Sequence, residues 1–159
     1  MSEPEGTVVA VCLRAEGGVP KQVQPQIKIG PHGVEGDYHS GEITMHGSRA
    51  GEPNLRHVSI VSEEAVQDAA ESLGVTIPQG GLGENILVRG LGDLGTVAPG
   101  QWLRFSSGVE LEVTAQNNPC KNLSVYHPKT PKQLYGRRGL LAVVKTPGAL
   151  KPGDKVTLG

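Results

Sequence analysis

Residues 109–114 read VELEVT, a segment in which apolar and polar side chains alternate strictly. A period of two residues predicts a β-strand, and it puts Val109, Leu111 and Val113 on the buried face. Pro25 has no backbone N–H to donate, so residues 23–29 are expected to form a strand at the edge of a sheet. Other short apolar segments predict further strands at residues 7–13, 57–61, 84–88, 101–105, 140–144 and 154–158.

Glycine and proline mark the ends of these segments. The 159 residues include 23 glycines and 12 prolines, which separate the apolar runs rather than cluster. Residues 98–101 (APGQ) and 151–154 (KPGD) both have proline second and glycine third, which predicts type II turns. A chain of this length with many short strands and tight turns indicates one mainly β domain, most simply a barrel.

The clearest helical pattern begins at Ser62 and is expected to stop at Gly74. Glu63 and Glu64 occupy the first turn, where the helix dipole favours carboxylates. One face carries Ala65, Val66, Ala69, Ala70 and Leu73. This pattern predicts a surface helix packed on the sheet.

Two other stretches interrupt the strands. Residues 117–139 are expected to hold short helical insertions, because Thr130-Pro131-Lys132-Gln133 resembles a capping box and Gly136 would end that turn. Residues 30–56 contain six glycines and have no period, so they predict a long loop that is functional or mobile. The sequence leaves open whether residues 40–56 are ordered.

Composition argues against several classes of protein. Fifteen Lys and Arg against sixteen Asp and Glu give a net charge of −1, which disfavours a protein that grips nucleic acid or an anionic membrane. No apolar run approaches the length of a membrane span, and the acidic start MSEPEG does not resemble a signal peptide. Two cysteines are too few for a disulfide scaffold, so a cytoplasmic location is expected.

Cys120 is the thiol with the strongest case for chemistry. It follows Asn118 and Pro119, which suit the cap and the first residue of a short helix. A thiol in that first turn, beside Lys121, would lie where the thiolate is favoured, the form that attacks sulfur or binds a soft metal. An inert loop cysteine is the alternative. Cys12 lies inside the predicted strand 7–13 and is expected to be a small buried apolar residue.

Two further motifs could bind a ligand. Arg137 and Arg138 could clamp a phosphate or an oxyanion, although an exposed charged pair at a turn fits the pattern equally well. The glycine-rich stretch 80–85 (GGLGEN) would let the backbone approach a ligand, with a plain turn as the alternative. That stretch lacks the Lys-Ser/Thr pair of a phosphate-binding P-loop.

The histidines do not predict a metal centre. His32, His39 and His46 recur at intervals of seven residues, and His57 follows. Structural zinc sites draw close pairs of Cys or His, two to five residues apart, and this chain has none.

The order of the motifs along the chain resembles the MOSC family, the domain also found at the C-terminus of molybdenum-cofactor sulfurases. The resemblance rests on GVEGDYHSG, RHVSIVSEEAV, GGLGENILVRGL, APGQWLRF, VELEVTAQNNPCKNL, GRRGLLAVV and LKPGD. It covers nearly all of the chain, which implies a single MOSC domain over residues 1–159 with its core at about 8–158. The implied fold is a MOSC-type β-barrel with one surface helix and short helical insertions.

The resemblance also implies a site. In the family the cysteine of the Pro-Cys motif carries sulfane sulfur or ligates molybdenum, which here is Cys120. The cofactor is molybdenum cofactor, a molybdopterin, and its phosphate is bound by basic residues. The residues of this chain that match the family's site motifs, or that could supply the positive charge, are Gly83, Glu84, Asn85, Arg137, Arg138, Arg56, Asp37 and His39.

Three functions follow as expectations. The first is a cofactor-binding or sulfur-carrier domain that exchanges molybdenum cofactor or a persulfide with a cysteine desulfurase or a molybdoenzyme. The second is a molybdenum-dependent reductase of N-hydroxylated compounds with an external electron donor. The third is a thiol-based metal sensor or interaction domain. The shortness of the chain favours the first, because the reductase relatives generally carry an additional domain or extension.

Overall fold

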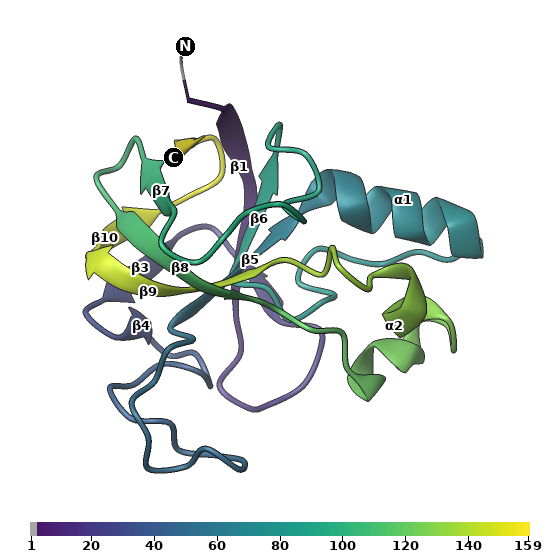
Figure 1. Cartoon of the computed structure of the whole chain (residues 1–159), viewed down its shortest axis with the longest axis horizontal. Coiled ribbons are helices and arrows are strands. Elements are labelled where there is room, and N and C mark those ends of the chain that lie inside the picture. Colours follow the sequence, from purple (N-terminus) through teal and green to yellow (C-terminus); the bar gives the residue numbers. More distant parts are fainter. Residues whose placement is uncertain (1–2) are drawn as a thin grey trace.

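The computed structural model describes residues 3–159 and contains a closed β-barrel (Figure 1). Its strands follow the order β11-β7-β8-β9-β5-β6-β1, and pairing of β11 with β1 closes the barrel. Their bounds are β1 Glu5–Leu13, β5 Val58–Ser62, β6 Ile86–Arg89, β7 Trp102–Phe105, β8 Glu110–Gln116, β9 Leu140–Thr146 and β11 Lys155–Leu158. The predicted mainly β class and the barrel are therefore confirmed.

The prediction of a single edge strand over residues 23–29 is wrong. The chain forms two strands there, β2 (Gln22–Gln24) and β3 (Ile27–Gly30), on either side of Pro25. β2 pairs with β1 at the edge of the large sheet, whereas β3 joins β4 (Gly33–Val34) and β10 (Gly148–Leu150) in a small second sheet. Proline cannot continue a hydrogen-bonded ladder, so the chain changes sheets at this residue.

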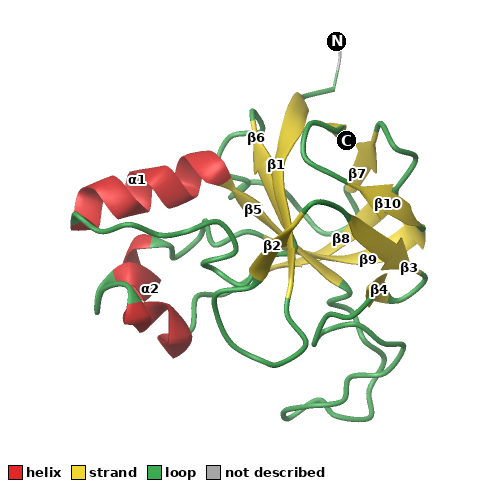
Figure 2. Ribbon diagram, turned by 180° about the vertical axis from the view of Figure 1, so that it is seen from behind, coloured by secondary structure: helices red, strands yellow, loops and turns green. Residues whose placement is uncertain are grey.

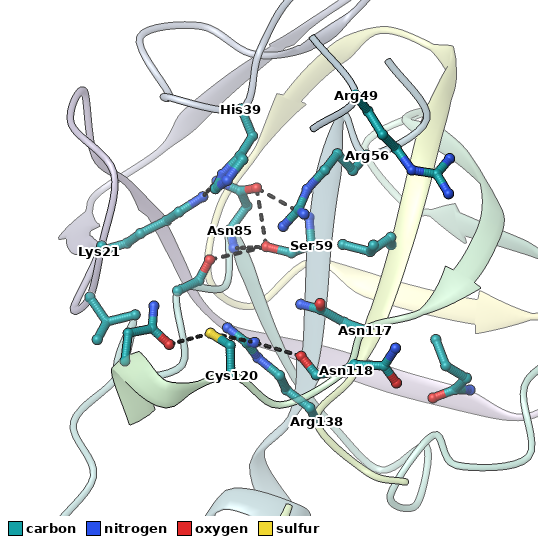
Figure 3. A pocket seen from close by; sticks show the side chains of 16 residues that line it. Lys21, His39, Arg49, Arg56, Ser59, Asn85, Asn117, Asn118, Cys120 and Arg138 are labelled. Carbon is teal, nitrogen blue, oxygen red and sulfur yellow. Dashed lines mark hydrogen bonds between the residues drawn. The ribbon is translucent and has the colours of Figure 1, made fainter. Parts of the chain in front are cut away.

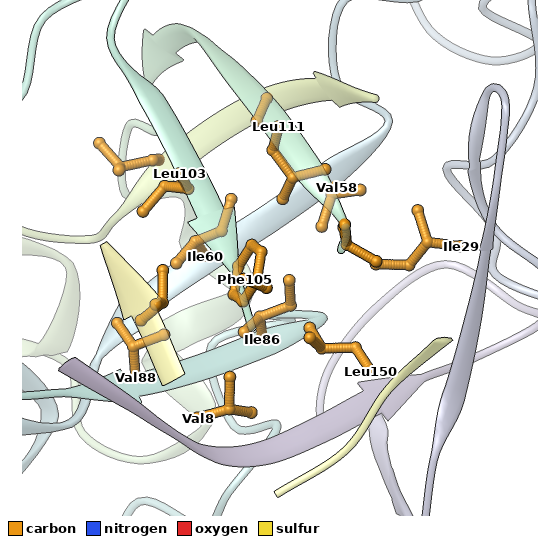
Figure 4. Packing of buried hydrophobic residues seen from close by; sticks show 14 of the residues in the cluster. Val8, Ile29, Val58, Ile60, Ile86, Val88, Leu103, Phe105, Leu111 and Leu150 are labelled. Carbon is orange, nitrogen blue, oxygen red and sulfur yellow. The ribbon is translucent and has the colours of Figure 1, made fainter. Parts of the chain in front are cut away.

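Aliphatic side chains fill the barrel (Figure 4). Val109, Leu111 and Val113 are buried there, as their alternation predicts. Ile60 and Ile86 pack against them from the strands β5 and β6. Burial of each such side chain contributes about 1.5–3 kcal/mol, so the barrel forms a firm base for the loops at its rim.

Helix α1 (Glu63–Leu73) packs on the outside of the barrel (Figure 2). The hydroxyl of Ser62 accepts the N–H of Ala65 at 3.2 Å, and Gly74 ends the helix with φ +65°, so both predicted ends are confirmed. Beneath the helix lies a second apolar cluster that includes Cys12. Burial, reinforced by Glu84, raises the pKa of the Cys12 thiol to about 12, which fits the predicted inert role.

Two short helices follow β8 and precede β9: the 3₁₀-helix η1 (Lys121–Val125) and α2 (Thr130–Gln133). The predicted capping box is wrong, because the turn begins one residue earlier, with Lys129 at the cap. Thr130 therefore lies inside the helix, and its buried hydroxyl makes no hydrogen bond within residues 3–159. The two type II turns form as predicted, closed by 3.2 Å bonds from Gln101 N–H to Ala98 O and from Asp154 N–H to Lys151 O.

The long loop is folded rather than shapeless. Residues 40–56 double back on themselves, with a bridge between Ile43 and Pro53 and a 2.8 Å bond from Thr44 N–H to Glu52 O. The buried amide of Asn54 ties its base by donating to the carbonyls of His39 and Gly41, at 2.8 Å each. In both ribbon views this loop projects from the barrel on the side away from the two termini (Figures 1 and 2).

None of the helices in residues 3–159 combines the length and the apolar character that crossing a bilayer requires.

Candidate functional site

A cavity of about 520 Å³ opens at the rim of the barrel, where the loops before β6 and β9 meet the end of β8 (Figure 3). It is lined by Gly18, Val19, Lys21, His39, Arg49, Arg56, Ser59, Gly83, Asn85, Gln116, Asn117, Asn118, Cys120, Asn122, Arg138 and Leu141. We call it the thiol cavity, after Cys120. Residues from widely separated parts of the chain converge on it.

Positive charge dominates the thiol cavity. Lys21, Arg49, Arg56 and Arg138 line it together with His39, and its lining contains no Asp or Glu. The chain as a whole carries a net charge of −1, so this concentration of cations is local. A cavity walled by one sign of charge attracts and holds ligands of the opposite sign. The thiol cavity is therefore suited to an anion.

Cys120 presents an exposed thiol to this cavity. The prediction that it lies in the first turn of a helix capped by Asn118 is wrong. Cys120 is itself the cap of η1, with extended backbone angles, and the helix has only five residues. Its neighbours are side chains instead: the sulfur accepts a bond from Arg138 Nη1 at 3.3 Å, and the thiol donates to the amide oxygen of Asn122.

Arg138 is the fixed cation beside the sulfur. Its side chain is buried, and its guanidinium donates to the carbonyls of Asn118 at 2.7 Å and Leu82 at 2.9 Å. Its Nε is buried without a hydrogen-bond partner among the described residues. These bonds hold the planar group in one orientation, with positive charge against Cys120.

Arg137 does not reach the thiol cavity. Its guanidinium pairs with Asp68 on α1 at 2.6 Å and donates to the carbonyl of Gln133 at 2.9 Å. Of the two adjacent arginines that the sequence singles out, the structure brings only Arg138 to Cys120, because successive side chains leave this turn in different directions.

Arg56 and Arg49 line the opposite part of the cavity from the long loop. Within residues 3–159, neither guanidinium has a hydrogen-bonded or ion-paired partner. Burial and the nearby charge of Arg138 both lower the pKa of Arg56. Two cations without counter-charges remain available for a bound anion.

Lys21, which the sequence analysis missed, forms a buried ion pair with Asp37 at 2.9 Å. The carboxylate of Asp37 also accepts the backbone N–H groups of Arg14 and His39, at 3.1 Å each. Asp37 does not line the cavity, so it acts by holding Lys21 and the start of the loop in place. Burial lowers the pKa of Lys21, against the opposing effect of Asp37.

His39 lines the cavity as a neutral ring. Burial, followed by the charges of Lys21 and Arg56, lowers its pKa to about 4. Its Nδ1 lies 3.4 Å from the ammonium of Lys21, which can only donate. Nδ1 must then accept, so we infer that the proton of the neutral ring is on Nε2. His39 can therefore donate one hydrogen bond from Nε2.

The three residues of the GEN motif have different environments. Gly83 and Asn85 line the cavity, whereas Glu84 does not. The buried carboxylate of Glu84 accepts the N–H groups of Gly80 at 2.9 Å and Leu82 at 3.0 Å, and burial raises its pKa. Glu84 thus closes the glycine-rich turn rather than meeting a ligand.

Asn85, directly before β6, links the strands β1 and β5 at the floor of the cavity. Its amide donates to the carbonyl of Cys12 in β1 and accepts the N–H of Ser59 in β5, at 3.1 Å each. No short-range pattern identifies Lys21, Arg49 or Ser59 as site residues, because each reaches the cavity only through the folding of distant segments. Asn117, Asn118 and Asn122 could have been found from their proximity to Cys120 in sequence.

The described residues contain no group of three or more His, Cys, Asp or Glu side chains placed to hold a metal ion.

Comparisons with known proteins agree on one family. The profile of the MOSC domain matches residues 39–157. A protein of Bacillus subtilis (strain 168), YuaD, is 33% identical over 146 residues, covering 78% of this chain and 74% of the relative; its name refers to metal-sulfur cluster biosynthesis.

Solved structures agree with this match. The crystal structure of Bacillus subtilis YuaD superposes with a TM-score of 0.87 and 25% identity, covering 97% of this chain and 95% of that one. YiiM from Geobacillus stearothermophilus superposes with a TM-score of 0.67 and 19% identity, covering 98% of this chain and 75% of that one, and it supports the fold alone.

Proposed function

Because the chain belongs to the MOSC domain family, we propose that it binds molybdenum cofactor in the thiol cavity and acts as a carrier of that cofactor or of its sulfur. The single observation that carries this proposal is an exposed thiol, Cys120, in a cavity lined by cations and free of carboxylates.

The donor set of the cavity fits an anionic pterin cofactor. Arg49 and Arg56 supply guanidinium groups without partners, and such groups bind phosphate through paired, charge-assisted hydrogen bonds. Lys21 and neutral His39 add two further donors on the same wall. We assign the phosphate to Arg56, whose charge lies near those of Lys21 and Arg138, and the sulfur-bearing end to Cys120. When bound, the cofactor would supply a redox-active metal, and the Cys120 sulfur would be the protein group that ligates it.

Cys120 can also carry sulfur by simple exchange. The Cys120 thiolate attacks the terminal sulfur of a persulfide on a donor protein, such as a cysteine desulfurase. One S–S bond forms on Cys120, the S–S bond of the donor breaks, and the donor leaves as a thiolate, so no oxidant is needed. Arg138, at 3.3 Å from the sulfur, offsets the negative charge of the thiolate and of the persulfide. We place this chemistry in the cytoplasm, where thiols remain reduced.

A molybdenum-dependent reductase of N-hydroxylated compounds is the second candidate. The specific observation that favours it is a second cavity that shares four lining residues with the thiol cavity. A reductase needs room for an organic substrate beside the metal, whereas a carrier does not.

The test is the molybdenum and pterin content of the full chain purified from a host that makes the cofactor. Wild type is compared with Cys120→Ser and with Cys12→Ala, which leaves Cys120 as the only thiol. We expect both molybdenum and pterin in the wild type and in Cys12→Ala, and loss of molybdenum in Cys120→Ser. Equal molybdenum in Cys120→Ser would remove Cys120 as a ligand.

The adjacent arginines provide a matched pair of variants for the role of the cation beside Cys120. Arg138→Gln removes the cation beside Cys120, whereas Arg137→Gln removes one that pairs with Asp68 outside the cavity. We expect Arg138→Gln to reduce cofactor content at least tenfold and Arg137→Gln to leave it unchanged. For the sulfur-carrier form, mass spectrometry after incubation with a desulfurase and cysteine should show a 32 Da adduct on Cys12→Ala and none on Cys120→Ser. Failure of both the cofactor and the persulfide assays in the wild type would refute the proposal.

A further inference from the structure

A second cavity, of about 740 Å³, lies between the long loop and the strands β8 and β9. We call it the loop cavity. His39, Arg49, Arg56 and Leu141 line both cavities, so these residues form a wall shared with the thiol cavity. The remaining walls come from residues 38–55 and from Thr114 and Ala115 of β8.

Exposed apolar side chains gather at this cavity. Ile43, Met45 and Leu55 line it and are 48%, 70% and 57% exposed. They are half of the large apolar residues that stand exposed in the described part of the chain, residues 3–159. Single exposed apolar residues are ordinary, but a group around one concave surface marks a binding site.

The loop cavity also has a flat side and a charged side. The rings of Tyr38 and His46 stack with their centroids 4.4 Å apart and an angle of 10° between their planes. Arg49 and Arg56 bring two cations to the shared wall, and the lining contains no Asp or Glu. A flat ring, an apolar body and an anionic group would each find a complementary surface here.

The cavity is already formed in the structure of the chain alone. The Ile43–Pro53 bridge holds the two arms of the loop together, and the buried Asn54 ties its base to the backbone of His39 and Gly41. Binding at a preformed site loses less conformational entropy than binding that must first order the loop.

We propose that the loop cavity binds a planar aromatic molecule that carries a carboxylate or another anionic group. The apolar body lies against Ile43, Met45 and Leu55, and the anionic group lies on Arg49. A molecule held in this way has its charged end at the wall shared with the thiol cavity, next to the chamber that contains Cys120. The inference concerns residues of this chain and holds whether or not the cofactor binds. If both hold, the loop cavity is where an organic substrate lies.

The probe is 2-naphthoate, titrated into the full chain and followed by NMR of backbone amides and methyl groups. The matched neutral ligand is 2-naphthalenemethanol, which has the same rings and no charge. We expect the methyl signals of Ile43, Met45 and Leu55 to shift, with naphthoate binding more tightly than the alcohol. Arg49→Gln should weaken naphthoate binding about tenfold and leave the alcohol nearly unchanged, since it removes a charge-assisted bond.

Substitution of the apolar wall gives the complementary result. Met45→Ser should weaken both ligands severalfold, and because the side chain is mostly exposed, the protein should remain folded. Val23→Ser is the control, since Val23 is 51% exposed on β2, away from the cavity, and should change neither ligand. The inference is overturned if the loop-cavity methyl signals do not move, or if Met45→Ser and Val23→Ser bind naphthoate equally well.

Cys120→Ser separates this inference from the proposed function. Cys120 does not line the loop cavity, so the variant should keep naphthoate binding. A protein that binds naphthoate but takes up neither molybdenum nor sulfur would refute only the proposed function. A protein that loads molybdenum but does not bind naphthoate would refute only this inference.

Discussion

Breaking the buried ion pair of Lys21 and Asp37 should lower the free energy of unfolding by several kcal/mol, and a double-mutant cycle measures the coupling between the two residues. Lys21→Met, Asp37→Asn and the double variant are compared with the wild type at pH 7. The side chains are 2% and 0% exposed, and their charged atoms lie 2.9 Å apart. Removing one partner leaves the other as an unpaired buried charge, which costs about 3–5 kcal/mol.

Burial rather than distance sets this magnitude. Arg137 and Asp68 are closer, at 2.6 Å, but Asp68 is mostly exposed to water. Exposed pairs contribute only about 0–1 kcal/mol because solvent screens them. Asp68→Asn is therefore the matched control, and it should lower the free energy of unfolding by less than about 1 kcal/mol.

The assay is urea unfolding followed by circular dichroism, with linear extrapolation to water. Each single variant should lose about 3–5 kcal/mol, a fall in Tm of roughly 6–20 °C for a chain of this size. The double variant leaves no unpaired charge, so it should lose less than the sum of the two single variants by about 2–3 kcal/mol. Additive losses, or single losses as small as that of Asp68→Asn, would show that Lys21 and Asp37 do not act as a pair.

Three further predictions concern the residues around the thiol cavity. The pKa of His39 is about 4 in the folded chain against an ordinary 6.5, so the unfolded chain binds more protons between these values. The contribution of neutral His39 to the free energy of unfolding is complete above pH 6.5 and is lost as the pH falls towards 4. This loss is at most about 3 kcal/mol, and solvent screening makes it smaller. Urea unfolding at pH 7 and pH 4.5 should thus show that the free energy of unfolding falls less with acid for His39→Gln than for the wild type. Equal falls would contradict the lowered pKa of His39. Gly139 has φ +127°, and a Cβ at this position would meet the carbonyl oxygen of Ile60. Gly139→Ala should therefore lower the free energy of unfolding by at least about 1–2 kcal/mol. A thermal melt measures this loss, and an unchanged Tm would refute the prediction. Since Arg138 precedes Gly139, the same variant should also displace the cation beside Cys120 and slow the reaction of Cys120 with a thiol reagent, because the thiolate is the reactive form. Arg137→Gln should leave that rate as in the wild type, and a Gly139→Ala rate equal to the wild type would argue against coupling of this turn to the site.

Much of the fold follows from local patterns. The alternation in residues 109–114 and the signals at Ser62 and Gly74 depend on neighbours within a few residues, and both predictions are confirmed. Local patterns were less informative about where an element begins and which sheet a strand joins. The start of α2 differs by one residue from the capping-box prediction, and the segment around Pro25 divides between two sheets.

The candidate site was predictable only in part. Cys120 and Arg138 were identified from the sequence, and the structure brings them within 3.3 Å of each other. The sequence could not distinguish Arg138 from Arg137, because the direction of each side chain depends on where α1 packs. Glu84 was expected at the site and instead closes a turn beside it.

The sequence alone was enough to predict a β-rich chain with one main helix, because strand period and helix caps depend on neighbouring residues. The order of its motifs was likewise enough for the family resemblance and for the choice of the thiol at Cys120. Only the tertiary structure revealed the cation-lined cavity and the role of Lys21. Lys21 and Asp37 are 16 residues apart, and Cys120 is a further 83 residues along the chain. Their proximity depends on closure of the barrel, and burial then determines which charges are paired and which remain available for a ligand.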